Sequence, residues 1–241
     1  MSESIRASEN MLKNKDLLLK PIAYVANGYQ EKFGTPRQSG LIEEMRCEII
    51  FEPWVYAEKA LQGLEDFSHV WLLWWFHQNT NERYLPIIKP PRLNGEKKGV
   101  FATRSPHRPN PVGLSLVRLL ATSKTSLICA GADLIQGTPI IDIKPYLPEV
   151  EALPEARGGW TTKTPQFPVQ VGWSELALEK LNLLTDLPTD FRTIIEKMIA
   201  GDPRPKVYKN NYEFMHGIRI YNVDVRFQFL NDTQAVIVDV V

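Results

Sequence analysis

The chain has 241 residues, of which 44% are hydrophobic and 23% are charged, and its 28 basic residues equal its 28 acidic ones. This composition is typical of a globular protein and excludes a disordered or fibrous chain. No apolar run approaches the roughly 18 residues of a membrane-spanning helix, and the amino-terminal residues lack the apolar core of a secretory signal. We therefore expect a cytoplasmic protein without a membrane segment, whose two cysteines, Cys47 and Cys129, are reduced.

Short apolar segments separated by turn residues fill the first part of the sequence. Branched and aromatic residues favour strands, and the Gly, Pro and Asn clusters between them mark turns. The run FSHVWLLWWF at 67–76 lacks clean alternation, which predicts a strand buried on both faces. A helix is expected at 55–64, where apolar residues recur with helical spacing. Strands are expected at residues 17–25, 41–51, 67–76, 100–102, 114–120, 126–134 and 140–144.

The composition changes after Pro148. Residues 149–168 are acidic and then rich in Gly, Thr and Pro, which predicts a linker or a long surface loop. Two helices and a terminal hairpin follow, and Ser174 is the expected N-cap of the first helix. The helices are expected at 174–183 and 188–200, and the hairpin at 217–229 and 235–241.

Taken together, these elements predict a mainly β protein with two domains. Many short strands and few helices favour a barrel or a curved, mostly antiparallel sheet. The predicted parts are a polar lead-in at 1–16, a β-barrel-like amino-terminal domain at 17–165 and a smaller α+β carboxy-terminal domain at 166–241.

The segment GVFATRSPHRPNPVGLSLV at 99–117 contains a rigid polar loop. Its three prolines fix φ and remove amide donors, so the loop cannot be helical. Polar groups held between apolar strands are typical of a binding or catalytic site. Arg108 stands among these prolines, which suits a guanidinium that grips a carboxylate or phosphate.

The segment 83–118 is strongly basic. It holds eight Lys or Arg residues and one acid, Glu96, so its local net charge is +7. Such a field favours a phosphate-bearing partner such as nucleic acid or a nucleotide. The alternative is a solvated basic face that the following acidic stretch balances.

Several familiar sites are absent from the sequence. It contains no glycine-rich dinucleotide fingerprint, no phosphate loop and no Gly-x-Ser-x-Gly elbow. The four histidines lack zinc-ligand spacing, so we expect no metal site. The remaining polar groups lie at strand ends, where a barrel can bring them together in one site. Each also has a structural interpretation, because Asp133 and Asp142 can cap turns and His77 can simply end a strand.

Five segments together resemble one family. They are PRQSGL (36–41), GLEDFSHVWLLWWFHQ (63–78), KPPRLNGEKKGVFATRSPHRPNPVGLSLV (89–117), DLIQGTPIIDIKPYLP (133–148) and DPRPKVY (202–208). The chain is similar over residues 18–230 to the TsaA-like family, whose members are S-adenosylmethionine-dependent tRNA methyltransferases. These enzymes methylate N6 of N6-threonylcarbamoyladenosine, the nucleoside just 3′ of the anticodon.

The resemblance implies a β-barrel core, a homodimer and a site for S-adenosyl-L-methionine. The residues that it places around this cofactor are Pro36, Arg37, Gln38, His77, Gln78, Arg108, Leu116, Asp133, Leu134, Ile135 and Gln136. It also implies binding of the tRNA anticodon loop, where basic side chains hold phosphates and tyrosines stack on bases. The residues assigned to tRNA are Arg104, Asn110, Lys144, Tyr146, Arg204, Lys206 and Tyr208.

The acylated N6 nitrogen is a poor nucleophile until it loses its proton, so a base should assist the transfer. Asp142 and His107 are the catalytic candidates, and Asp133 is a further carboxylate of suitable chemistry. One residue departs from the family pattern Asp-x-x-Asp-Gly-Thr-Pro, since Gln136 replaces the second acid. Two alternatives stay open: a non-catalytic RNA- or nucleotide-binding module with the same barrel, and an enzyme that acts on a small anionic metabolite.

Overall fold

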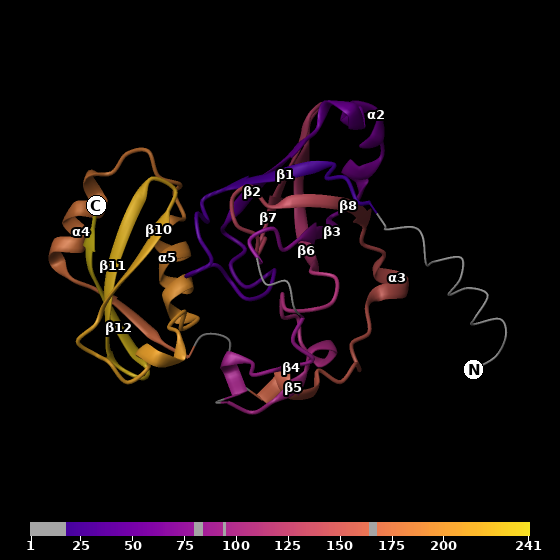
Figure 1. Cartoon of the computed structure of the whole chain (residues 1–241). Coiled ribbons are helices and arrows are strands. Elements are labelled where there is room, and N and C mark those ends of the chain that lie inside the picture. Colours follow the sequence, from indigo (N-terminus) through magenta and orange to yellow (C-terminus); the bar gives the residue numbers. More distant parts are fainter. Residues whose placement is uncertain (1–17, 80–83, 94, 164–167) are drawn as a thin grey trace.

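The computed structural model describes residues 18–79, 84–93, 95–163 and 168–241, so the predicted lead-in at 1–16 lies outside the described residues. Six antiparallel strands form a closed barrel in the order β1-β2-β7-β6-β3-β8 (Figure 1). Closure leaves no unpaired strand edge in this sheet. The strands are β1 (Ala23–Asn27), β2 (Arg46–Phe51), β3 (His69–Trp75), β6 (Val112–Thr122), β7 (Ser126–Ala130) and β8 (Pro139–Pro145).

The central strand β3 alternates in burial, so the prediction that both its faces are buried is wrong. Val70, Leu72 and Trp74 point into the barrel core, whereas Trp75 is exposed on the outer side. The prediction failed because the outer face of β3 also carries aromatic residues, Trp71 and Trp75. Trp71 is half-buried, and its indole Nε1 donates to Glu151 Oε1 at 2.9 Å.

Short elements connect the barrel strands, and several differ from expectation. The expected helix at 55–64 is reduced to α2 (Ala57–Ala60), between the 3-10 turns η1 (Pro53–Val55) and η2 (Leu64–Asp66). The predicted strand at 100–102 is wrong, because these residues form a 3-10 turn, η4 (Val100–Ala102). This turn follows a small two-stranded sheet, in which Ile87 pairs with Gly99 and Ile88 with Lys98. The sheet and the turn beside it are β4 (Ile87–Ile88), η3 (Pro91–Leu93) and β5 (Lys98–Gly99).

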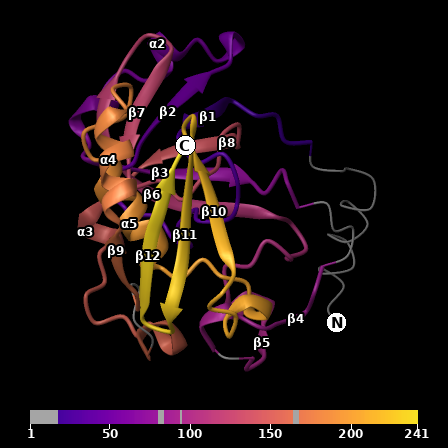
Figure 2. The same cartoon turned by 90° about the vertical axis from the view of Figure 1, so that its left-hand side faces the viewer.

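The expected linker contains α3 (Pro148–Glu151) and η5 (Gly159–Lys163). It leads to a four-stranded sheet in the order β10-β11-β12-β9, whose strands β10, β11 and β12 lie side by side in Figure 2. The predicted hairpin is therefore part of a larger sheet. The elements are β9 (Gln170–Trp173), α4 (Glu175–Leu183), α5 (Phe191–Ala200), η6 (Lys206–Tyr208), β10 (Met215–Ile220), β11 (Val223–Asn231) and β12 (Gln234–Val240).

Local signals explain two features of this carboxy-terminal domain. The Ser174 hydroxyl accepts from the backbone N–H of Ala177 at 3.1 Å, which confirms the predicted N-cap of α4. The run 217–229 divides into two strands because Tyr221 takes a left-handed conformation with φ of 53°. A turn there reverses the chain from β10 into β11, so one alternating run gives two strands.

The carboxy-terminal sheet has its own apolar core, distinct from that of the barrel, and loop residues of the barrel domain contribute to it. Helix α5 lies between the four-stranded sheet and the barrel (Figure 1), and its apolar residues are buried. Tyr29, Ile42 and Met45 come from the barrel half of the chain but pack into this cluster. Lys197 Nζ of α5 also binds Glu44 Oε1 at 2.5 Å. A mainly β fold with a barrel and a smaller α+β domain is confirmed, and apolar loop residues of the barrel domain hold the two parts together.

Candidate functional site

A cavity of about 190 Å³ opens at the end of strand β3. The residues after β3, the loop that contains Pro106 and the turn after β7 all line it, and Asn79 Nδ2 links the first two by donating to the carbonyl of Pro106 at 2.8 Å. The cavity brings together Pro36, His77, Gln78, Asp133, Leu134 and Ile135, six of the residues expected to bind the cofactor. The other lining residues are Lys32, Thr35, Trp74, Phe76, Asn79, Pro106 and Thr138.

Aromatic rings form one wall of the cavity. The rings of Trp74 and Phe76 are tilted against each other, with centroids 4.2 Å apart. Gly113 is the cross-strand partner of Trp74 in β6, and the indole lies where a Cβ at position 113 would be. A glycine is therefore needed beneath this ring for it to lie flat against the strand.

Replacing Gly113 with alanine is expected to displace the Trp74 ring and to lower the free energy of unfolding by about 1–3 kcal/mol, the usual cost of overpacking. Urea unfolding followed by tryptophan fluorescence measures this change. Gly217→Ala in β10 is the matched control, because a Cβ at that position meets nothing within 4 Å. Equal stability of the two variants would show that Trp74 does not depend on Gly113.

Asp133 places a carboxylate against this apolar wall. Its Oδ1 accepts a hydrogen bond from Ser115 Oγ at 2.5 Å, and Ser115 Oγ in turn accepts from Trp74 Nε1 at 2.9 Å. Burial raises the pKa of Asp133, against which the Ser115 hydrogen bond and the charge of Arg104 act. A carboxylate in such surroundings attracts a cation or a strong hydrogen-bond donor, because an unpaired charge is costly there.

The turn after Asp133 is fastened to the start of the barrel by Gln136. Its side-chain Oε1 accepts from the backbone N–H of Asn27 at 2.7 Å, and its own N–H donates to the carbonyl of Tyr29 at 2.7 Å. Asn27 Nδ2 completes the link by donating to the carbonyl of Leu134 at 2.7 Å. A carboxylate oxygen accepts the same backbone bond, which is why glutamine can replace the usual acid without loss of this turn.

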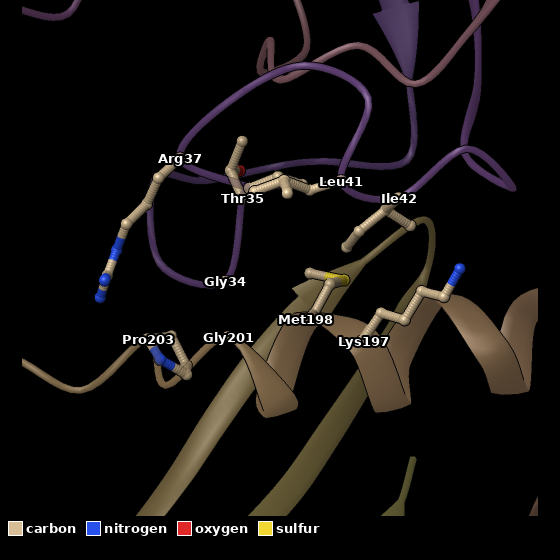
Figure 3. A pocket seen from close by; sticks show the side chains of 10 residues that line it. Gly34, Thr35, Arg37, Leu41, Ile42, Lys197, Met198, Gly201 and Pro203 are labelled. Carbon is tan, nitrogen blue, oxygen red and sulfur yellow. The ribbon is translucent and has the colours of Figure 1, made fainter. Parts of the chain in front are cut away.

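The loop at 36–38 joins both domains. Arg37 Nη2 donates to the carbonyl of Asp202 at 2.7 Å, so this guanidinium contacts the carboxy-terminal domain. Gln38 Oε1 accepts from Arg104 Nη1 at 2.6 Å, and Gln38 Nε2 bonds the carbonyl of Arg37. A second, smaller pocket of about 40 Å³ lies between this loop and α5 (Figure 3). Thr35 and Pro36 line both pockets.

Both catalytic candidates lie outside the larger cavity. Asp142 is half-exposed, and its Oδ2 pairs with Lys144 Nζ at 2.7 Å. The backbone of His107 bonds Leu85 and Ser105, whereas its neighbour Pro106 lines the cavity. Arg108 is also outside the cavity, and its Nη1 donates to the carbonyl of Thr103 at 3.3 Å.

The expected tRNA-binding residues do not form one cluster. Arg104 and Asn110 are exposed on the rigid polar loop within residues 99–117, called the proline-rich loop below. Lys144 and Tyr146 lie towards the opposite end of β3, where Tyr146 contacts Trp71 edge to face. Leu116, expected near the cofactor, also pairs with Trp71 and does not line the cavity. Lys206 and Tyr208 are at the two ends of η6, and the Tyr208 ring stacks on Phe214 at 4.4 Å.

Arg204 is not placed to contact phosphates. Only 2% of its surface is exposed, and its guanidinium binds Asp202 and the carbonyl of Lys209. It also lies over the Phe229 ring, with 3.5 Å to the centroid. The structure therefore does not support the expected contact with phosphates, because the Arg204 guanidinium is already hydrogen-bonded within its own loop.

The chain matches the tRNA-methyltransferase O N-terminal domain family over residues 24–152 and the TrmO C-terminal domain family over residues 166–241. An S-adenosylmethionine-dependent methyltransferase of Pseudomonas aeruginosa is 38% identical over 213 residues, which cover 88% of this chain and 92% of the relative. The tRNA (adenine(37)-N6)-methyltransferase of Escherichia coli is 37% identical over 215 residues, or 86% and 91% of the two chains. The crystal structure of TrmO from Pseudomonas aeruginosa matches with a TM-score of 0.76 at 33% identity, over 94% and 99%.

The chain belongs to the tRNA-methyltransferase O family. Membership confirms the resemblance drawn from the sequence motifs, and with it the enzyme class, a tRNA (adenine-N6)-methyltransferase. Among the described residues of this family member, no cluster of His, Cys, Asp and Glu could hold a metal ion. In the same part of the chain, no helix is long and apolar enough to cross a membrane.

Sequence reasoning missed several residues that shape the site of this tRNA-methyltransferase O chain. Trp74, Phe76 and Ser115 come from the barrel strands or their ends and were read only as core or strand residues. Burial along β3 alternates, with Trp74 on the inward face beside Val70 and Leu72, but apolar and aromatic residues on both faces hide this alternation in the sequence. Nothing local in the sequence indicated that Ser115 bonds Asp133 across 18 positions.

Proposed function

We propose that this chain transfers a methyl group from S-adenosyl-L-methionine to N6 of threonylcarbamoyladenosine at position 37 of tRNA, next to the anticodon. The observation that carries the proposal is the cavity at the end of β3, where the Asp133 carboxylate faces the aromatic wall of Trp74 and Phe76. Two relatives in the family, named above, are a methyltransferase dependent on this methyl donor and a tRNA (adenine(37)-N6)-methyltransferase.

The residues of the cavity suit this methyl donor. When bound, S-adenosylmethionine supplies an electrophilic methyl group on a positively charged sulfonium. Asp133 offers a negative charge in partly buried surroundings, and the ring faces of Trp74 and Phe76 attract a cation. His77 and Gln78 stand exposed at the rim, where they can bind the polar ends of the molecule. Pro36, Leu134 and Ile135 supply apolar contact area.

Catalysis in such a site depends mainly on alignment. Holding the two reactants in line is worth roughly 7–11 kcal/mol of the barrier. The tied loops of the cavity serve this purpose, because Asn79 bonds Pro106 and Gln136 bonds Asn27 across different segments. Deprotonation of N6 needs a basic group, and Asp133 is the carboxylate that lines the cavity. Asp142 and His107 lie outside it, so we do not route the proton through either of them.

We propose that the tRNA anticodon loop binds across the proline-rich loop and η6. The target nucleoside is in a single-stranded loop, so it can enter a pocket without the opening of a duplex. Arg104 and Asn110 are exposed near the cavity, and the stacked rings of Tyr208 and Phe214 offer a platform for bases. We further propose a cytoplasmic homodimer, in which Lys144 is available to a second subunit because it lies away from the cavity of its own chain.

The test is transfer of labelled methyl from S-adenosylmethionine to tRNA isolated from cells that lack this protein. The modified nucleoside is then identified by mass. We expect N6-methylated threonylcarbamoyladenosine, and we expect no product on tRNA that lacks the threonylcarbamoyl group. Binding of tRNA without transfer would support the non-catalytic binding module instead. Absence of any salt-dependent tRNA binding would favour the enzyme for a small anionic metabolite.

A further inference from the structure

Ser115 is a buried hydroxyl in the inner wall of the barrel. It is 0% exposed and lies on β6, between the aromatic wall of the cavity and the turn that carries Asp133. Its Oγ is 2.9 Å from Trp74 Nε1 and 2.5 Å from Asp133 Oδ1. Three residues that lie on β3, on β6 and after β7 are thus joined in one hydrogen-bonded chain.

The direction of each hydrogen bond in this chain follows from the donor chemistry. An indole N–H can only donate, so Ser115 Oγ must accept from Trp74. A serine hydroxyl has a single proton, which is then available for Asp133. The Trp74 ring is itself held in place by Gly113 beneath it and Phe76 beside it. Rotation of the Ser115 side chain away from the carboxylate would therefore also leave the indole N–H unpaired in the core.

We infer that Ser115 is a positioning residue of the methyl-donor site. Its hydroxyl holds the Asp133 carboxylate ionised and aimed into the cavity, and the hydrogen bond from Trp74 sets the direction of the hydroxyl proton. The inference rests on the proposed function, because it takes S-adenosylmethionine as the ligand that Asp133 faces. It assigns a functional consequence to a serine that is fully buried and does not itself line the cavity.

Opposing influences act on the pKa of Asp133. Burial raises the pKa of its carboxyl, and the Ser115 hydrogen bond is the largest influence that lowers it again. Arg104 acts in the same direction, through its charge. Tyr29, which follows β1, and Cys47 on β2 face Asp133 as neutral groups, and Lys32 and His77 line the same cavity. Loss of the Ser115 proton donor should therefore raise the pKa of Asp133 further.

The experiment compares Ser115→Ala with the otherwise unchanged full-length chain. First, the pKa of Asp133 is followed in the ligand-free protein by carbon NMR of its side-chain carboxyl. We expect Ser115→Ala to raise this pKa, and Trp74→Phe, which keeps an aromatic ring but removes the indole N–H, to raise it less. Second, calorimetry measures S-adenosylmethionine binding from about pH 5 to about pH 9. Ser115→Ala should weaken binding by about tenfold near neutral pH, in line with the loss of a hydrogen bond to a charged group.

Two controls separate positioning from a structural effect. The series is repeated with His77→Asn introduced into both the parent chain and Ser115→Ala. Burial lowers the pKa of His77, so its titration would otherwise overlap with that of Asp133. In an Asp133→Asn background, Ser115→Ala should weaken binding no further, since the group that it positions has lost its charge. Equal weakening with and without the Asp133 charge, or an unchanged pKa of Asp133, would overturn the inference.

Failure of the inference and failure of the proposed function give different results. If the parent chain does not bind S-adenosylmethionine, the proposed function fails, while the NMR titration still tests whether Ser115 controls Asp133. If the parent chain binds the methyl donor but Ser115→Ala binds it equally at every pH, the inference fails and the proposed function stands.

Discussion

Asp133→Asn is expected to weaken S-adenosylmethionine binding by roughly 10- to 100-fold and at the same time to raise the melting temperature of the protein. The first effect follows because hydrogen bonds to charged groups are worth about 1.5–3 kcal/mol. The melting temperature should rise because the partly buried charge of this carboxylate destabilises the folded protein, and the amide removes that charge. Loss of affinity combined with a gain of stability is the signature of a residue kept for binding.

The pH dependence of stability has a definite sign. The pKa of Asp133 is raised in the folded protein, so the folded state holds its proton more tightly than the unfolded chain. The corresponding stabilisation is fully present below the unfolded pKa and is lost as the pH rises through the folded pKa. Asp133→Asn should therefore gain most over the parent chain at neutral pH and little in strong acid, as thermal unfolding at several pH values would show.

Asp142→Asn is the matched control for this variant. Asp142 is also an aspartate of the barrel domain, in strand β8, but it is half-exposed, is paired with Lys144 and lies outside the cavity. We expect calorimetry to give unchanged affinity for S-adenosylmethionine with Asp142→Asn. The assignment of Asp133 to the site fails if both variants lose affinity equally, or if Asp133→Asn binds as the parent chain does.

Arg204→Met is expected to lower the free energy of unfolding by about 3–5 kcal/mol, the usual cost of removing one partner of a buried ion pair. Arg204 binds Asp202 through two hydrogen bonds, Nε to Oδ1 at 2.8 Å and Nη2 to Oδ2 at 3.2 Å. Both side chains are almost fully buried, and the Asp202 carboxylate also pairs with Lys209 Nζ at 3.3 Å. Methionine keeps the apolar contact with Phe229 but leaves the carboxylate poorly paired.

The acid sensitivity of the protein should change with this variant. Burial alone would raise the pKa of Asp202, but the hydrogen bonds and charges of Arg204 and Lys209 hold it below its usual value. The stabilisation from this lowered pKa is present above the unfolded pKa and is lost as the pH falls through the folded one. The parent chain should therefore lose stability in strong acid by a step that Arg204→Met largely lacks.

Urea unfolding at neutral pH measures the main effect, with Arg192→Met as the control. Arg192 pairs with Glu196 on the surface of α5 at 2.9 Å, and exposed pairs of this kind contribute only about 0.3–0.5 kcal/mol. The loss of stability should also affect the loop at 36–38, because the Asp202 carbonyl accepts a hydrogen bond from Arg37. Equal stability of the two arginine variants would show that Arg204 is not a structural residue, and would restore it as a candidate for tRNA contact.

Local chemistry determined much of the fold. The strands at 114–120, 126–134 and 140–144 were found to within a few residues, because their turns carry Ser, Gly and Pro at places where the chain must bend. The N-cap of α4 was also correct, since a serine side chain satisfies a backbone donor wherever it begins a helix. The strand at 100–102 failed, because three apolar residues fit a 3-10 turn as well as a strand.

Long motifs of unusual composition were enough to predict the family, the polar loop and the cavity residues Pro36, His77, Gln78 and Asp133 from the sequence. The contacts of Trp74, Ser115 and Arg204 could not be predicted without the packing of the folded chain. Burial and hydrogen bonding depend on partners distant along the chain, such as the pair Ser115–Asp133 or Arg37–Asp202. The sequence does not distinguish a buried arginine from one that binds phosphate, because the difference lies in the packing around the side chain.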